Sequence, residues 1–376
     1  MDSLPFHDAI EEFLGRTSVR KRLDQGVIVK VMKKFFIHFY PATLLEGVNA
    51  NLAYTNSILK RYPKSRVLYS SGISLNASMV FLVAAAKKIG WTIIGSQHGG
   101  HHGYLMDHVL ALETEMPFCD YFVTWGWGKD AVPNVPDTTT LIPLPSPMFS
   151  SKSADWNKVL NYNDRYAESK KFDFTFLPNK VYPFTPPPSG AHATSNHLRS
   201  IIDDLSTTVS RIVSSGRSLR VKPYGRETVS LMPRLYKQLS SQDEPRITVS
   251  RSISKGISLD LIQSSRLILW DQPGTGFMEC LSGDIPTMVY WRREYNEELS
   301  SARDVFDWLE RLGIVHKSLD RLLESSEEFF DSPQSWWEDG ERGRCRSEFM
   351  NRYGRIDEDW ARTWRSFLGN AGSLTR

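Results

Sequence analysis

The sequence of 376 residues has little cysteine, no long apolar run and almost no excess charge of either sign, and each shortage excludes a class of protein. Its three cysteines, Cys119, Cys280 and Cys345, lack C-x-x-C spacing, which argues against a disulfide scaffold and suits a reducing compartment. No uncharged apolar stretch approaches the roughly 18–20 residues that span a bilayer, and the first residues do not resemble a secretory signal. We therefore expect a cytoplasmic protein.

The charge balance argues against a nucleic-acid partner. Lysine and arginine number 46 against 43 aspartates and glutamates, a net charge of +3. The distribution is uneven, however, because residues 1–66 carry eleven basic and six acidic side chains around the apolar segment 27–40. This segment either packs in the core or lies on a membrane surface, so a peripheral location at the inner face of the membrane stays open.

A βαβ unit is the clearest feature of the first half. Residues 66–69 are expected to form a short strand, residues 91–95 form a second strand that is apolar and β-branched, and a helix is expected over 76–88 between them. The second run does not alternate, which is typical of a parallel strand that is covered on both faces. Further strands are expected at 119–127 and 140–144, so the unit belongs to a parallel sheet with its ligand crevice at the carboxyl ends of the strands.

A loop rich in glycine and histidine follows the run 91–95. Gly99, Gly100 and Gly103 lack the Cβ atoms that would keep a ligand from the backbone, and His98, His101 and His102 lie where that ligand would bind. Imidazole can act as a base or hold a phosphate near neutral pH. The alternative is an ordinary turn after a strand. A metal site is disfavoured because the spacing offers no cysteine and no clear carboxylate partner.

The second half repeats the α/β pattern. Strands are expected at 172–177, 219–224, 246–249, 267–270 and 285–290, and a helix over 197–214. The turn 271–276 opens another helix, and its amide groups suit an anion. The remainder, 295–376, is expected to be helical, with Trp308, Trp336, Trp337, Trp360 and Trp364 in its core.

We expect an α/β protein with two Rossmann-like domains. The first covers residues 1–148, a polar linker covers 149–170, and the second domain with a helical tail covers 171–376. Prolines at 143, 145 and 147 mark the joint. The first domain has only three or four strands, so it is expected to be truncated or naturally short.

A set of short motifs resembles the signature of bacterial transferases of surface-carbohydrate biosynthesis. Each is weak alone, but their order and spacing over residues 44–370 are specific in combination. The motifs are Gln97-His98-Gly99-Gly100, Gly103-Tyr104, Asp120-Tyr121, Thr124-Trp125-Gly126-Trp127, Phe277-Met278-Glu279, Ile285-Pro286-Thr287, Gly313-Ile314-Val315-His316 and Trp336-Trp337.

This resemblance implies a GT-B type glycosyltransferase, with two Rossmann-like domains facing across a cleft. Such an enzyme moves a sugar from a nucleotide-sugar donor to a surface polysaccharide, such as lipopolysaccharide or capsule, or to a glycolipid acceptor. The chain is also distantly similar to CMP-Kdo-dependent transferases, which suggests a CMP-sugar as donor. Those enzymes carry a Lys-Pro-His-Pro-like element, whereas this chain has Lys222-Pro223-Tyr224-Gly225, so the nucleotide stays undecided.

The candidate site residues fall into two groups, and no cofactor or metal is expected because basic side chains can replace Mg²⁺ at the phosphates. His98 is the candidate base or charge stabiliser, and four carboxylates compete for the role of base or nucleophile. The catalytic candidates are His98, Asp107, Glu113, Glu115 and Asp120. The donor-binding candidates are Gln97, Gly99, Gly100, Arg220, Lys222, Tyr224, Asp271, Thr275, Gly276 and Glu279.

Two other functions remain open from the sequence. The chain could be a non-catalytic scaffold of a polysaccharide-assembly complex, in which case it would bind no nucleotide. It could also be a hydrolase or epimerase of nucleotide sugars, which would share the fold and act without a sugar acceptor.

Overall fold

The computed structural model describes residues 46–73, 76–106, 114–160, 165–178, 195–224, 246–250, 257–293 and 296–371. The apolar segment 27–40 lies outside these ranges. By their internal contacts the residues form two compact units, one of residues 1–63 and 77–82 and the other of residues 64–76 and 83–376.

The described part of the first unit consists of two helical segments. Helix α4 (Val48–Arg61) ends with one residue left before Pro63. Lys60 and Arg61 lie in its last turn, where cations interact favourably with the helix dipole. The first turns of α5 (Ala77–Lys88) belong to the same unit. Ser78 donates a hydrogen bond to the Oδ1 atom of Asn51 at 2.6 Å, which ties the two segments together.

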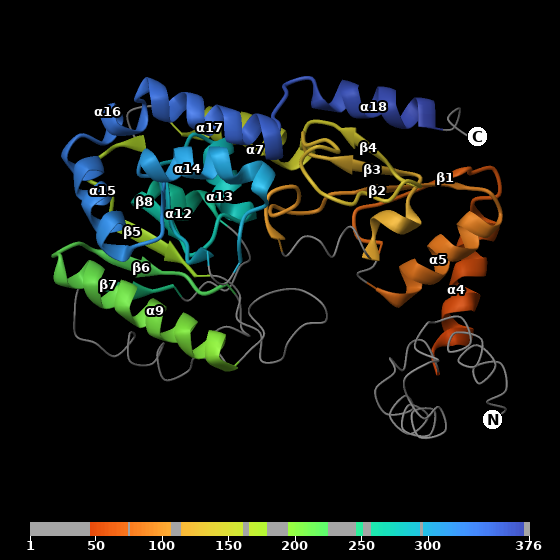
Figure 1. The fold of residues 1–376 in the computed structure, drawn as a ribbon, viewed down its shortest axis with the longest axis horizontal. Helices are drawn as coiled ribbons and strands as arrows, with labels where there is room; N and C mark the ends of the chain where they lie inside the picture. Colours follow the sequence, from red (N-terminus) through yellow and green to blue (C-terminus); the bar gives the residue numbers. More distant parts are fainter. Residues whose placement is uncertain are drawn as a thin grey trace. The chain divides into compact units, whose positions relative to one another are not determined.

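The second unit contains two parallel sheets (Figure 1). The first has the order β1-β2-β3-β4, and every described pair in it is parallel. All five residues of β2 are buried, as the run without alternation predicts. Its strands are β1 (Val67–Ser70), β2 (Thr92–Ser96), β3 (Tyr121–Thr124) and β4 (Thr140–Pro143).

The second sheet has the order β10-β9-β8-β5-β6-β7, again parallel throughout its described pairs. The chain enters at β5, runs outward to β7, returns to β8 on the other side of β5 and ends at β10. This is the strand order of a Rossmann fold, in which the direction reverses beside the first strand. Its strands are β5 (Phe172–Leu177), β6 (Leu219–Val221), β7 (Ile247–Val249), β8 (Ser265–Trp270), β9 (Thr287–Tyr290) and β10 (Val315–His316).

Helices connect and cover the second sheet. Helix α9 contacts β6, and α13 contacts β8, β9 and α17. The helices are α9 (Ser195–Ser214), α12 (Leu259–Gln263), α13 (Thr275–Ser282), α14 (Arg303–Arg311), α15 (Leu319–Asp331), α16 (Pro333–Trp337) and α17 (Gly340–Tyr353), with short 3₁₀ turns η3 (Met116–Phe118) and η6 (Ser300–Ala302). None of the helices in the described ranges is long and apolar enough to cross a membrane.

Two elements differ from the sequence-based expectation. The stretch 149–170 is expected to be a polar linker, but its first half belongs to helix α7 (Pro147–Val159), which contacts α13. The Ser146 hydroxyl caps this helix by accepting a hydrogen bond from the Phe149 N–H, and proline occupies its first position. The tail was expected to be all helical, but it contributes the two-residue strand β10 to the sheet.

The last helix, α18 (Trp360–Ala371), returns to the first sheet. Trp364 packs in a cluster with Ile94 of β2 and Val123 of β3, and its indole N–H donates to the Pro145 carbonyl at 2.8 Å. Trp336, Trp337 and Trp364 are buried as predicted, whereas Trp308 and Trp360 are only partly buried. The α/β fold class with two parallel sheets is confirmed.

Candidate functional site

Gln97 organises the loop that follows β2. Its side-chain carbonyl accepts hydrogen bonds from the Trp125 backbone N–H at 2.9 Å and from the Trp127 indole N–H at 2.8 Å. Its amide group donates to the Gly99 carbonyl at 2.8 Å. Because Gln97 is buried, these bonds fix the glycine-histidine loop against the aromatic turn that follows β3.

The same loop contacts the segment that precedes α13. The Gly100 N–H donates to the Thr275 hydroxyl at 2.7 Å, and the Tyr104 hydroxyl donates to the Pro273 carbonyl at 2.6 Å. A Cβ atom on Gly100 would lie 2.7 Å from the Thr275 nitrogen. Gly100 therefore allows two backbones to approach each other, a use of glycine different from the predicted approach to a ligand.

Two histidines and a glutamate converge beside this contact. The Nδ1 atom of His98 lies 3.9 Å from a carboxylate oxygen of Glu115, and the ring centroids of His98 and His102 are 4.9 Å apart. The ligand atoms of His98, His102 and Glu115 all lie within 4.8 Å of one another. Glu115 is the carboxylate partner that the spacing along the chain did not reveal.

The burial of these three side chains differs. His98 keeps 33% of its side chain exposed, whereas Glu115 keeps 5%. His102 is fully enclosed, and burial, with smaller contributions from His98 and His101, lowers the pKa of its imidazole well below the usual value. His102 is therefore neutral at pH 7, and His98 is the histidine of the group that solvent and ligands can reach.

The other predicted catalytic carboxylates do not join this group. Asp107 and Glu113 lie outside the described residues. Asp120 precedes β3, at the end of that strand opposite to the glycine-histidine loop. Its carboxylate accepts a hydrogen bond from the Ile93 N–H at 2.8 Å and lies 3.9 Å from the Lys87 ammonium, so it holds the amino ends of two strands together.

Arg220 lies within β6 and Lys222 directly follows the strand, and the two side chains differ in surroundings. The Arg220 guanidinium donates to Thr175, Ser265 and the Leu261 carbonyl and lies over the Phe172 ring, so its donors are engaged inside the sheet. Lys222 is 2% exposed, and burial, followed by the charge of Arg220, lowers the pKa of its ammonium. Tyr224, two residues further, is exposed.

The predicted residues around α13 lie in one segment after β8. Asp271 is partly buried in the turn, and Thr275 opens the helix. Gly276 is required for packing, because a Cβ there would lie 2.1 Å from the Trp270 ring. Glu279 forms an ion pair with Lys152 of α7, with 2.7 Å between Oε1 and Nζ. Burial raises the pKa of the Glu279 carboxyl, and Lys152 opposes that rise.

Lys152 is not among the predicted site residues, because it lies in the stretch that is expected to be a linker. Lys152 pairs with the Oε1 atom of Glu279. The other oxygen of that carboxylate, Oε2, is buried and accepts no hydrogen bond from the described residues. A serine followed by proline at 146–147 signals the start of a helix and could have placed Lys152 on it.

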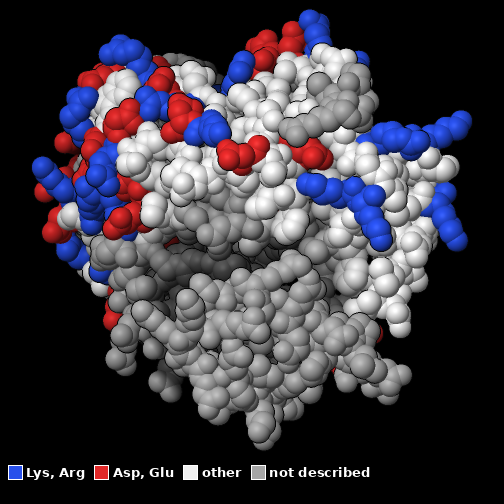
Figure 2. All heavy atoms as spheres, turned by 45° about the vertical axis from the view of Figure 1, so that its right-hand side comes forward, with Lys and Arg blue, Asp and Glu red and all other residues white. Residues whose placement is uncertain are grey.

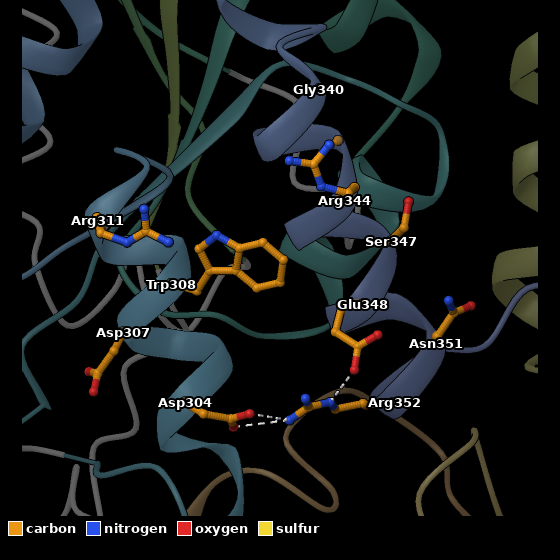
Figure 3. Close-up of a pocket in the computed structure, with 11 residues that line it drawn as sticks. Asp304, Asp307, Trp308, Arg311, Gly340, Arg344, Ser347, Glu348, Asn351 and Arg352 are labelled. Atoms are coloured by element: carbon orange, nitrogen blue, oxygen red, sulfur yellow. Dashed lines mark hydrogen bonds and ion pairs between the residues drawn. The ribbon is translucent and has the colours of Figure 1, made fainter.

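A separate groove of about 980 Å³ lies between α14 and α17 (Figure 3). Arg352 donates to both carboxylate oxygens of Asp304 and to Glu348 at its edge. The residues that line the groove include none of the predicted site residues. Its charges neutralise one another across the surface, so its stability requires no ligand.

Together these features define an α/β protein with two parallel sheets, the second in Rossmann strand order, whose carboxyl-end loops contact each other at Gly100 and Thr275. The chain belongs to the LIC12162 family transferases, whose sequence model matches residues 7–368. The transferase class that the motifs indicate is therefore confirmed.

A search of the curated proteins found none that matches. Among solved structures, the chain is similar to the UDP-GlcNAc 2-epimerase from Methanocaldococcus jannaschii, with 12% identity, coverage of 84% of this chain and 81% of that chain, and a TM-score of 0.46. It is also similar to MurG of Acinetobacter baumannii, with 11% identity, coverage of 86% and 78%, and a TM-score of 0.42.

Proposed function

We propose that this transferase moves a glycosyl group from a nucleotide-sugar donor to a carbohydrate or glycolipid acceptor. The supporting observation is the position of α13 beside the second sheet. The strand order reverses between β5 and β8, and a turn of four residues separates β8 from the start of α13. In open parallel sheets, ligands bind outside the carboxyl ends of the strands at this reversal.

The donor phosphate is proposed to bind at the first turn of α13. The first N–H groups of a helix lack partners within the helix, and its N-terminus carries roughly half a positive charge. Lys222 follows β6, which pairs with β5, so it lies at the same carboxyl edge of the sheet. These groups stabilise the negative charge on the departing nucleotide without a metal ion.

Glu279 is proposed to bind the sugar or ribose of the donor. It lies one turn into α13 from the proposed phosphate position. Lys152 holds one of its oxygens, while Oε2 makes no hydrogen bond to the described residues and can accept one from a hydroxyl group. Asp271, Thr275 and Tyr224 are retained as donor contacts, and Arg220 is assigned to holding the sheet.

His98 is proposed to take the proton of the acceptor. The acceptor oxygen forms a bond to the anomeric carbon of the donor, the bond from that carbon to the phosphate oxygen breaks, and the hydroxyl proton moves to the His98 imidazole. Glu115 faces the same imidazole at 3.9 Å and stabilises it once protonated. Since Gly100 contacts Thr275, His98 lies two residues from the proposed phosphate site.

The acceptor is proposed to be a surface polysaccharide or a glycolipid, reached at the inner face of the membrane through the basic residues 1–66. This part of the proposal rests on the sequence motifs and the charge of that segment.

On the left of Figure 2, basic and acidic side chains of the described residues intermix, whereas protein surfaces that bind nucleic acid gather basic side chains. We therefore propose no nucleic-acid partner.

A thermal-shift screen against CMP, CDP, UDP, GDP and dTDP tests the proposal. A nucleotide at a hundred times its dissociation constant stabilises the fold by about 2.7 kcal/mol. We expect stabilisation by one of them in the wild type and a smaller one in Glu279→Gln. Stabilisation by none would favour a scaffold. Donor turnover that releases sugar to water without an acceptor would favour a hydrolase or epimerase.

A further inference from the structure

We propose that His98, His102 and Glu115 bind one Zn²⁺ ion. Two imidazole nitrogens and a carboxylate oxygen are ligands that zinc takes in proteins, and here they converge to within 4.8 Å of one another. They come from two segments, the loop after β2 and the residue before η3, so the fold and not local sequence spacing assembles the set.

Binding of zinc requires the ligand atoms to draw together from separations of up to 4.8 Å. Zinc bonds of about 2.0–2.1 Å in a tetrahedral arrangement place ligand atoms roughly 3.3 Å apart. His98 and Glu115 are already 3.9 Å apart, and the two histidine rings stand nearly perpendicular, with an interplanar angle of 78°. His98 is partly exposed, so its ring can rotate to close the group, whereas the enclosed His102 and Glu115 provide a fixed base.

The three ligands differ in how far solvent can reach them. His102 and Glu115 are buried, whereas His98 keeps 33% of its side chain exposed. Three protein ligands leave one coordination position open on the side of the exposed His98, where water or substrate can enter.

Zinc would prevent proton transfer at this site. Coordination occupies the His98 nitrogen that faces Glu115, so the loaded chain lacks the base proposed above. Binding of the ion stands on the geometry alone, whereas this inhibitory consequence rests on the proposed function. The two can therefore fail separately: a chain without transferase activity can still bind zinc, and an active chain can lack the zinc site.

Isothermal titration of the chelator-treated full chain with Zn²⁺ tests the site. The variants are His98→Ala and Glu115→Gln, and the control is Glu168→Gln, which changes an exposed glutamate outside the group. We expect one bound ion per chain in the wild type and control, and at least ~100-fold weaker binding in each variant, since loss of a ligand exceeds the 10–100-fold effect of an outer partner. Mg²⁺, which prefers all-oxygen sites, should not bind.

Co²⁺ provides a second readout, because its visible absorption reports ligand number when it replaces zinc. We expect bands typical of four or five ligands in the wild type and their loss in His98→Ala. His98 is partly exposed, so this change leaves folding intact, as circular dichroism would verify. The proposal is overturned if the wild type binds no Zn²⁺, or if His98→Ala and Glu115→Gln bind it as tightly as Glu168→Gln.

Discussion

Lys152 of α7 and Glu279 of α13 form an ion pair with 2.7 Å between Nζ and Oε1. The carboxylate keeps only 8% of its side chain exposed, while the lysine keeps 34%. The pair joins the helix after the first sheet to the helix that begins at the strand reversal of the second. Lys152 therefore favours the charged state of Glu279, which burial disfavours.

Replacement of Lys152 by methionine should destabilise the fold by about 1–3 kcal/mol, because a buried carboxylate loses its cation. The raised pKa of Glu279 sets the pH dependence. A carboxyl whose pKa is higher in the folded than in the unfolded chain stabilises the fold at a pH below its pKa in the unfolded chain. This stabilisation is lost as the pH rises through its pKa in the folded chain. Urea unfolding of Lys152→Met should therefore show a deficit that grows from pH 4 to pH 7. An equal deficit at both pH values would contradict this.

Gly100→Ala should disturb the contact between the two loops. Its Cβ atom would meet backbone atoms of Gly274 and Thr275 at 2.9 and 2.7 Å, and backbone cannot move aside cheaply. We expect a loss of about 1–3 kcal/mol in the free energy of unfolding, together with weaker nucleotide binding.

Gly343→Ala is the matched control for Gly100→Ala. Position 343 lies inside α17, where an added Cβ meets nothing within 4 Å. Alanine favours a helix over glycine, so this variant should gain up to about 1 kcal/mol. Equal effects of the two substitutions on urea unfolding would show that the close approach at Gly100 carries no cost.

His316 should make the fold sensitive to acid. Burial lowers the pKa of its imidazole to about 4, below the usual 6.5, and Nε2 lies 2.9 Å from the Gly313 carbonyl. A depressed folded pKa gives stability above pH 6.5 that is lost as the pH falls towards 4. The difference corresponds to about 3 kcal/mol. Urea unfolding at pH 7 and pH 4 should show a smaller acid loss in His316→Asn, and an unchanged loss would refute the assignment.

Trp364→Ala should cost about 3–5 kcal/mol, because its indole fills the cluster between α18 and the first sheet. Leu368→Ala, at a 39% exposed position on the same helix, should change stability by less than about 1 kcal/mol. Urea unfolding of both variants measures the difference. Similar small effects would mean that α18 does not stabilise the first sheet.

The sequence predicts the strands well where local patterns decide them. The run 92–96 lacks alternation and is fully buried, and the strands β1, β5 and β8 are found within two residues of expectation. Strand β10 is not predicted because its two residues, Val315 and His316, are too few to show a periodic pattern of apolar side chains. The strand forms only because it pairs with β9. Helix α7 is not predicted because its many polar residues resemble a linker, although Ser146 and Pro147 form a typical helix start.

The candidate site is less predictable than the fold because its contacts join distant residues. His98 and Glu115 are both candidates in the sequence, but only the fold brings them together. Lys152 and Glu279 come from separate halves of the chain. The glycines at 100 and 276 signal close packing, and the sequence does not reveal whether the neighbour is a ligand, a backbone or a tryptophan ring.

The measurement that tests the central claim most directly is calorimetric titration of the full chain with nucleotide sugars, comparing the wild type with Lys222→Met and with the control Lys171→Met, whose lysine is exposed. If the donor phosphate binds at the strand reversal beside Lys222, one nucleotide sugar should bind the wild type and Lys171→Met alike. It should bind Lys222→Met at least roughly tenfold more weakly, because a charge-assisted contact is lost. Equal binding by Lys222→Met, or no binding by the wild type, would contradict the account.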